Sequence, residues 1–271
     1  MVKDNEKRDN MPKPEGSSSN EDLVYGRRPV LELFEIGRGI NKLLVAKGAS
    51  DSTMIKKVIS MARERKIPVL EVEKIALDRM VDGANHQGIA GYVSPIEYVE
   101  IEHLIKLAED KNEDLFVVLA DGVMDPQNLG SIIRTANAAG AHGVVVPARR
   151  GAQVSSTVVR ASAGACIHTP VARVSNLIQA IDKFKKAGAW VVGTDIEAPK
   201  YHYESNLEGK LVVVMGNEGE GISRLVKENC DFCVKMPMFG EIGSLNVGVA
   251  WGIIAYEIVR QRLLGNKKTQ G

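Results

Sequence analysis

The sequence has few cysteines and few aromatic residues, and its two signs of charge nearly cancel. Of its 271 residues, three are cysteine and 5% are aromatic, while 35 Lys and Arg stand against 34 Asp and Glu. Three cysteines in a chain of this length give no disulfide framework and are typical of a reducing compartment, so we expect a cytoplasmic protein. The net charge of +1 argues against a uniformly basic nucleic-acid-coating protein but leaves local basic patches open.

Long apolar runs are also absent. No segment approaches the roughly 20 consecutive apolar residues that a membrane-spanning helix requires. Residues 1–21 combine charge, Pro and Ser without a hydrophobic stretch, which is not the pattern of a secretory signal, and we expect them to form a disordered tail. With 44% hydrophobic and 25% charged residues, the remainder has the composition of a soluble globular protein.

A metal site has little support in the sequence. Cys230 and Cys233 form a C-x-x-C pair, but no second pair stands at zinc-ligand spacing. Cys166 and the five histidines are scattered along the chain. We therefore interpret the pair as part of a packed strand and expect no metal.

Residues 22–95 alternate short apolar strands with amphipathic helices, which indicates a small α/β domain. The predicted helices end at Glu35, Arg65 and Met80, and the predicted strands are Lys42–Ala46, Pro68–Val72 and Ile89–Val93. Nine basic residues collect in this domain and form either a solvated helix face or a phosphate-binding face. They are Arg27, Arg28, Lys42, Lys47, Lys56, Lys57, Arg63, Arg65 and Lys66.

A charged stretch at residues 96–113 predicts a helical linker to a second domain at 114–266. In that domain five or six apolar strands alternate with helices, a pattern typical of an α/β fold with a parallel sheet covered on both faces. The predicted strands are Leu115–Ala120, Gly143–Val146, Trp190–Thr194, Leu211–Met215 and Cys233–Met236. The predicted helices are Leu129–Ala139, Thr157–Ala165, Val174–Ala187, Gly221–Glu228 and Val247–Leu263.

Three loops that follow strands of this sheet combine glycine with polar side chains. They are Asp125–Ala136, Met215–Ile222 and Pro237–Ala250. Open parallel sheets bind ligands at the carboxyl ends of their strands, and glycine permits a close approach of the backbone. Each loop alone could be a plain turn, with Asn128 a helix cap and Arg134 a surface residue. Their joint occurrence favours a ligand site.

A dinucleotide site is the main competing interpretation of the second loop. Gly216, Gly219 and Gly221 follow an apolar strand, but they give G-x-x-G-x-G and not G-x-G-x-x-G. A ribose-binding acid about 20 residues further on is also missing, because Asp231 comes too early. The sequence therefore disfavours nicotinamide chemistry.

Taken together, the three loops resemble the three motifs of the SpoU/TrmH family, which are S-adenosylmethionine-dependent RNA ribose 2′-O-methyltransferases of the SPOUT class. The resemblance is carried by Asn128–Ala136, Met215–Gly221 and Ser244–Ala250. In addition, Val24–Glu32 and Asn85–Ile89 are similar to the L30-like substrate-binding domain of RlmB-like enzymes, which methylate a guanosine of 23S rRNA. The resemblance implies an N-terminal L30-like domain and a C-terminal SPOUT domain with a deep trefoil knot, which general physical rules would not predict.

The resemblance also implies a cofactor, site residues and partners. The cofactor is S-adenosyl-L-methionine, contacted by Thr194, Gly216, Met236 and Leu245. The catalytic set is Arg134, Asn128, Glu218, Ser244 and Asn246, with Arg134 acting on the ribose hydroxyl either as a base or, more mildly, as an orienting group. The partners are RNA, with 23S rRNA favoured, and a second copy that pairs through Val247–Leu263. Glu241 departs from the Ser- or Gly-rich lead of relatives and has no assigned role.

Two alternatives share this fold. A tRNA 2′-O-methyltransferase usually lacks the N-terminal domain, so the presence of this domain favours an rRNA substrate. A non-catalytic RNA-binding factor for ribosome assembly is disfavoured because all five polar site residues are present. The modified nucleotide is not encoded in a readable pattern, since structured RNA is recognised through shape, splayed bases and phosphates.

Overall fold

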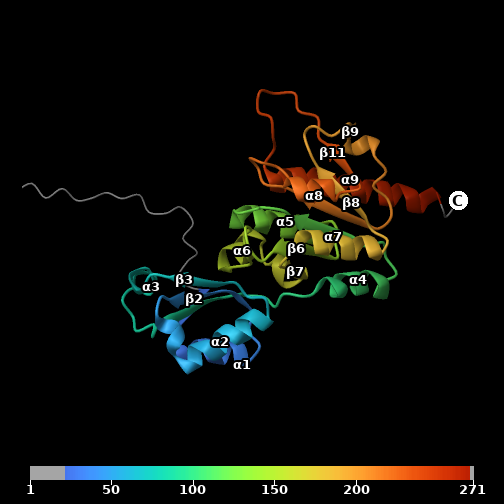
Figure 1. Cartoon of the computed structure of the whole chain (residues 1–271). Coiled ribbons are helices and arrows are strands. Elements are labelled where there is room, and N and C mark those ends of the chain that lie inside the picture. Colours follow the sequence, from blue (N-terminus) through green and yellow to red (C-terminus); the bar gives the residue numbers. More distant parts are fainter. Residues whose placement is uncertain (1–21, 269–271) are drawn as a thin grey trace, which may run out of the picture.

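The computed structural model describes residues 22–268. The tail expected at residues 1–21 lies outside the described residues. Figure 1 shows two lobes, each built on its own sheet, that are joined by an extended segment between β4 and α4. None of the helices in the described part of the chain is long and apolar enough to cross a membrane.

The N-terminal lobe is a four-stranded sheet in the order β1-β4-β2-β3, in which β2 and β3 are parallel and the other pairs antiparallel. Side chains of β2 alternate between the two faces: Leu43 and Val45 pack under α1 and α2, and Leu44 packs with Leu77 of α3 on the other face. The strands are β1 (Leu23–Tyr25), β2 (Ile40–Ala46), β3 (Val69–Val72) and β4 (Ile89–Val93). The helices are α1 (Arg27–Glu35), η2 (Ala49–Asp51), α2 (Thr53–Glu64) and α3 (Lys74–Met80).

The C-terminal lobe is a seven-stranded parallel sheet in the order β7-β6-β5-β10-β8-β11-β9. Its strands are β5 (Phe116–Ala120), β6 (Gly143–Pro147), β7 (Val171–Val174), β8 (Trp190–Thr194), β9 (Lys200–Tyr201), β10 (Leu211–Met215) and β11 (Phe232–Lys235). Its helices are α4 (Ile101–Asp110), α5 (Pro126–Ala138), α6 (Ser156–Ala161), η3 (Ala165–Ile167), α7 (Leu177–Lys186), η4 (His202–Glu204), α8 (Arg224–Glu228) and α9 (Val247–Lys268). Phe116 and Val118 point toward α5, α6 and α9, while Val117 and Leu119 point toward α4, α7 and α8.

The structure differs from the sequence prediction in several segments. The stretch 96–113, predicted as a helical linker, does contain a helix, α4, but this helix belongs to the C-terminal lobe, because Ile101, Leu104 and Ala108 are buried against the seven-stranded sheet. The helix predicted from Val174 begins at Leu177, because Val171–Val174 form β7 and Asn176 caps α7 by accepting from the Ile178 and Gln179 N–H groups. The helix predicted at Thr157–Ala165 ends at Ala161, since Ala163 and Gly164 have positive φ. No strand was predicted at the positions of β1 and β9.

Helix α9 packs across α5 at unusually close range. A Cβ added at Gly248 would lie 2.5 Å from the Ser131 Oγ and 2.9 Å from its Cβ, so a larger residue at that crossing would force α5 and α9 to shift. Trp251 is fully buried there, and its indole N–H donates to the Ile132 carbonyl at 3.1 Å. The first half of α9 is therefore fixed to the helix that carries Asn128.

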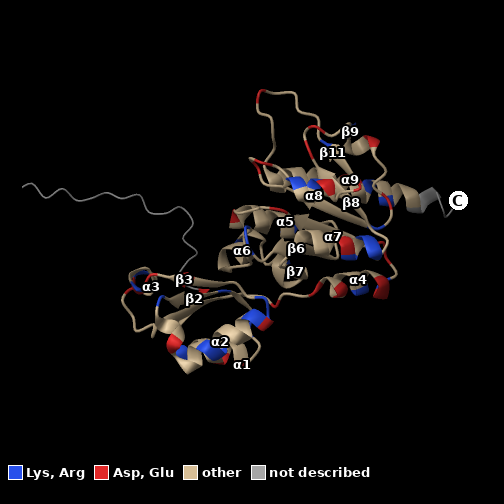
Figure 2. Cartoon of the chain, viewed as in Figure 1, with Lys and Arg blue, Asp and Glu red and all other residues tan. Residues whose placement is uncertain are grey.

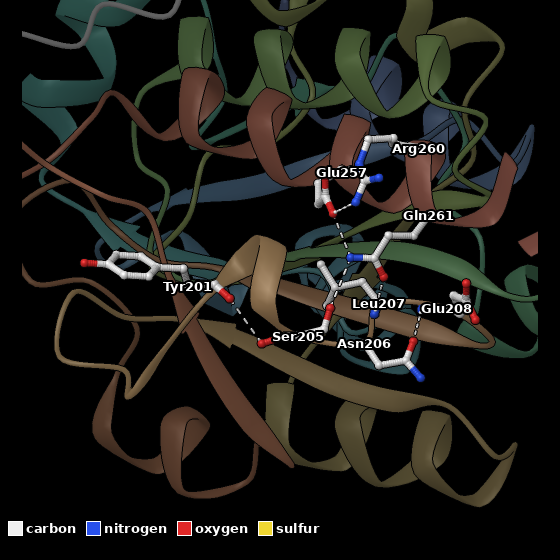
Figure 3. A network of polar contacts seen from close by, with 8 residues as sticks. All are labelled: Tyr201, Ser205, Asn206, Leu207, Glu208, Glu257, Arg260 and Gln261. Carbon is white, nitrogen blue, oxygen red and sulfur yellow. Dashed lines mark hydrogen bonds and ion pairs between the residues drawn. The ribbon is translucent and has the colours of Figure 1, made fainter. Parts of the chain in front are cut away.

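The second half of α9 is fixed to the segment that follows β9, as Figure 3 shows. The Gln261 side chain accepts from the Leu207 N–H at 2.8 Å and donates to the Ser205 carbonyl at 3.1 Å. Gln261 also donates to Glu257, which pairs with Arg260. These contacts tie the second half of α9 to residues 205–207; the trefoil knot itself stays a prediction.

Candidate active site

A pocket of about 510 Å³ opens at the carboxyl ends of β8, β10 and β11. Its walls are the loops that follow these strands, together with the segment that leads into α9. The lining includes residues 194–197, 215–222, 234–236 and 243–245. This is the edge at which parallel sheets bind ligands, and two of the three predicted loops, Met215–Ile222 and Pro237–Ala250, form much of the wall.

One wall of the pocket depends on glycine at position 216. A Cβ at Gly216 would lie 2.2 Å from the Gly221 carbonyl carbon and 2.3 Å from the Ile222 nitrogen. Asn217 and Gly221 exchange two backbone hydrogen bonds of 2.9 Å, which close the loop on itself. The Asn217 side chain also accepts from the Gly219 N–H at 2.9 Å. The backbone of this loop therefore faces the pocket directly, without a side chain at position 216.

The pocket is lined by apolar side chains and by charged side chains that are mostly acidic. Met215, Ile222, Val234, Met236 and Leu245 supply the apolar lining. The charged lining residues are Asp195, Glu197, Glu218 and Glu220 against Lys227 and Lys235. Since acids outnumber bases, the pocket favours a ligand that has an apolar part and a positive charge.

Asp195 and Lys227 form an ion pair at the edge of this pocket. Burial alone would raise the pKa of Asp195, but hydrogen bonds from Lys227 and the Glu197 N–H, with the charge of Lys227, outweigh it and lower that pKa. The hydrogen bond from Lys227 in turn raises the pKa of the lysine. Neither residue was predicted from the sequence to belong to the site. The available signal was position, because Asp195 directly follows β8, as Asp121 follows β5.

Asn128, Glu218 and Asn246 meet beside the pocket although they come from three separate elements: the first turn of α5, the loop after β10 and the residue before α9. The Asn246 side chain donates to the Asn128 Oδ1 at 2.7 Å and to the Glu218 Oε1 at 2.7 Å. Asn128 donates to the same Glu218 oxygen at 2.9 Å. The Asn246 Oδ1 accepts from the Gly248 N–H at 2.9 Å, so Asn246 also caps α9. One hydrogen-bonded cluster thus locks the three predicted loops together.

The remaining predicted residues divide into two groups. Thr194, Gly216, Met236, Ser244 and Leu245 line the pocket. Arg134 is exposed on α5 and is not part of the lining. It has no hydrogen-bond or ion-pair partner within residues 22–268. Arg134 comes six residues after Asn128 on α5, which places it about 9 Å further along the helix axis. Ser131 lies midway between them on the same side of the helix.

Two N-terminal motifs also meet in space. Arg27 and Gln87 lie 60 residues apart, yet the Arg27 N–H donates to the Gln87 side chain at 3.2 Å and the Arg27 Nε to the Gln87 carbonyl at 3.1 Å. A pocket of about 320 Å³ opens beside them, lined also by Arg28 and Asn85. The segments Val24–Glu32 and Asn85–Ile89, which carry the resemblance to a substrate-binding domain, therefore form one basic site.

Cys230 and Cys233 lie against Gly193 of β8. A Cβ at Gly193 would lie 2.8 Å from the Cys233 Sγ and 3.0 Å from the Cys230 Sγ, so glycine is needed there. The neighbouring Cys230 thiol, whose S–H donates to the Val226 carbonyl at 3.3 Å, lowers the pKa of Cys233 to about 7. The neighbouring Cys233 and burial raise the pKa of Cys230. Within residues 22–268, no three His, Cys, Asp or Glu side chains group as metal ligands would.

We expect iodoacetamide to alkylate Cys233 before Cys230, with a rate that is half-maximal near pH 7, because the thiolate is the reactive form. Cys230→Ala removes the neighbouring thiol and should return the Cys233 pKa toward the ordinary value of about 8.5, slowing the reaction at pH 7 on the order of tenfold. Peptide mass spectrometry across pH 5.5 to 9 measures both thiols. Equal labelling of both, with a midpoint above pH 8, would contradict the assignment.

Known proteins match the chain over both lobes. The model of the SpoU rRNA Methylase family matches residues 115–256, and the model for RNA 2′-O ribose methyltransferase substrate binding matches residues 23–99. The chain is 43% identical over 245 residues to a putative TrmH family tRNA/rRNA methyltransferase, YacO, of Bacillus subtilis strain 168. That alignment covers 90% of this chain and 98% of the relative.

The solved structures that are similar to this one include two RNA-modifying enzymes. An AdoMet-bound rRNA methyltransferase from Sinorhizobium meliloti has a TM-score of 0.55 at 27% identity, over 88% of this chain and 86% of its own. The A. aeolicus TrmH/SpoU tRNA modifying enzyme has a TM-score of 0.52 at 30% identity, over 61% of this chain and 84% of its own.

Proposed function

The chain belongs to the SpoU rRNA methylase family, and from this membership we propose that it transfers a methyl group from S-adenosyl-L-methionine to a ribose 2′-hydroxyl in RNA, at a guanosine of 23S rRNA. The observation that carries the proposal is the cluster of Asn128, Glu218 and Asn246 beside the pocket. It unites three segments that lie up to 118 residues apart and places polar side chains beside a ligand pocket.

Three features of the pocket fit S-adenosyl-L-methionine. Its volume of about 510 Å³ falls within the range of small-molecule sites. The bare backbone at Gly216 can approach a flat base, whose polar edge can pair with main-chain N–H and C=O groups. The acidic lining suits a sulfonium. The residues that would hold the cofactor are Thr194, Gly216, Met236 and Leu245, and once bound it would supply an activated methyl group.

The residues outside the pocket would prepare the ribose. A 2′-hydroxyl is a weak nucleophile and must lose its proton as the new C–O bond forms. Arg134 would orient that hydroxyl and the adjoining phosphate, because a guanidinium is a poor base but a good donor to oxygen. Asn128 and Asn246 hold the Glu218 carboxylate in place, and Ser244 shapes the site beside them. Alignment of the hydroxyl with the methyl group would then supply much of the acceleration.

The substrate is proposed to be rRNA because of the N-terminal domain. The rRNA methyltransferase of S. meliloti aligns over 88% of this chain, whereas the A. aeolicus tRNA modifying enzyme aligns over 61%. Arg27, Arg28 and Asn85 add a polar and basic site to that domain. Such groups suit phosphate and base contacts.

The test is a methylation assay with tritiated cofactor on unmodified 23S rRNA and, separately, on unmodified tRNA. Incorporation into 23S rRNA, at a ribose that lacks its 2′-O-methyl group in a strain without this protein, is the expected result. Incorporation into tRNA alone would show that the substrate is tRNA and not rRNA. No incorporation into either RNA would favour a non-catalytic RNA-binding factor.

We propose also that the active form is a homodimer with twofold symmetry. Helix α9 presents an exposed apolar stripe at helical spacing, formed by Val249, Ile253, Tyr256 and Leu263. The same stripe lies on the helix that Asn246 caps, so a second copy there would sit beside each site.

A charge in this stripe should separate the two copies. We expect Ile253→Glu to be a monomer at micromolar concentration, because an unpaired carboxylate would be buried in the interface. Light scattering measures the mass, and circular dichroism checks that the fold is retained. Lys186→Ala, at an exposed position of α7, is the control that should remain dimeric. A wild-type protein that is monomeric at this concentration would refute the dimer.

A further inference from the structure

A crevice of about 220 Å³ lies between the two domains. Its lining comes from the segments that follow α1 and α2, the connecting segment, strand β7 and the residues directly after β6 and β7. Figure 2 shows the basic end of α2 directed toward the connecting segment. The charged lining residues are Arg38, Arg65, Lys66 and Arg173 against Glu97 and Glu100. The crevice therefore carries a positive balance although the chain as a whole is nearly neutral.

Arg173 is the deepest of these cations and lacks a negative partner. Its Nη1 donates to the Ile40 carbonyl at 2.7 Å, and its guanidinium lies 4.4 Å from the centre of the Tyr98 ring. Burial lowers its pKa, and among the described residues no carboxylate forms an ion pair with it. A half-buried charge without a counter-ion is costly, so an anion in the crevice would be favourable.

The crevice opens at the same edge of the sheet as the active-site pocket. Ala148 follows β6 and Ser175 follows β7, so both lie at carboxyl ends of strands, as the pocket does at β8, β10 and β11. In the sheet, β10 lies three strands from β7 and β8 lies four strands from it. The crevice and the active-site pocket are therefore separated by roughly 15–20 Å along this edge. Arg149 and Arg150, exposed and without described partners, directly follow the β6 end of the crevice.

We propose that this crevice binds a backbone phosphate of the same RNA whose ribose enters the active-site pocket. The proposal rests on the proposed RNA methyltransferase function. Arg173 supplies directed N–H donors, which suit phosphate oxygens. Arg38 and Lys66 at the mouth add mobile positive charge. A phosphate held here would contact both domains at once and so set the position of the RNA relative to the active site.

The test compares Arg38→Ala/Lys66→Asn with wild type and Lys186→Ala. Lys66 has φ of 55°, which Asn tolerates, so the substitution avoids new strain. Lys186 is exposed on α7 and lies at the opposite edge of the sheet. The probe is unmodified 23S rRNA transcript, and its dissociation constant is measured over a salt series. Cofactor binding by calorimetry serves as the check that the pocket is intact.

For the double variant we expect about tenfold weaker RNA binding and a salt slope smaller by about 0.7–0.9 for each lost phosphate contact. Lys186→Ala should behave like wild type, and all forms should bind the cofactor equally. Wild-type affinity and slope in the double variant, or an equal loss in Lys186→Ala, would overturn the phosphate site while leaving methyl transfer by wild type intact. If wild type itself neither binds nor methylates RNA, the proposed function falls and the phosphate site with it.

Discussion

An Arg134→Ala variant should lose methyl transfer by about 10²–10³-fold while binding S-adenosyl-L-methionine as the wild type does. The reason is its position: Arg134 is exposed on α5, lies outside the pocket lining and has no partner within the described chain. Its removal therefore breaks no packing and no cofactor contact. What is lost is the donor that would orient the hydroxyl. Single-turnover transfer from tritiated cofactor measures the rate, and calorimetry measures cofactor affinity.

Arg134→Lys separates the charge of this side chain from its shape. Lysine keeps the positive charge but loses the planar, two-pronged donor, so we expect part of the rate to return if charge alone stabilises the reacting oxygen. An unchanged melting temperature in both variants confirms that the fold is intact. A drop in cofactor affinity that matches the drop in rate would show that Arg134 supports the pocket, and the catalytic role would then be rejected.

The central strands could be predicted because burial on both faces leaves a continuous apolar run. Leu211–Met215 was predicted with the bounds that the structure shows, and Phe116–Ala120 within one residue. Edge strands lack that signal. In β7, Arg173 interrupts the apolar pattern, and β9 is two residues long, so neither could be distinguished from a helix or a loop. For α4 the helix itself was predicted, but its packing depends on the sheet against which Ile101, Leu104 and Ala108 are buried.

Part of the site could also be predicted. Asn128, Glu218 and Asn246 were identified through the resemblance, yet their mutual hydrogen bonds depend on how α5, β10 and α9 are placed by the fold. Asp195 and Lys227 were missed because a single acid after a strand is a common turn residue. The contact between Arg173 and Ile40 spans 133 residues, and no local pattern records a contact of that length.

Gly216→Ala should abolish cofactor binding. The added methyl carbon would lie 2.2–2.4 Å from three backbone atoms of Gly221 and Ile222, and the loop cannot yield without breaking the paired hydrogen bonds between Asn217 and Gly221. Overpacking against backbone typically costs about 1–3 kcal/mol or more. We expect at least about a hundredfold loss of affinity, because the same displacement moves the pocket wall and the neighbouring Glu218. Calorimetric titration with S-adenosyl-L-methionine is the measurement.

Gly219→Ala is the matched control, three residues along the same loop. A Cβ there would have the Asn217 Oδ1 at 3.9 Å as its nearest neighbour, its φ is not positive, and the Gly219 N–H can still donate to that oxygen. This variant should bind the cofactor within about threefold of wild type, since alanine meets no steric conflict. The pair thus separates the need for close backbone approach at Gly216 from a general need for a flexible loop. Equal losses in the two variants would show that flexibility decides binding, and the role of Gly216 as a bare pocket wall would be wrong.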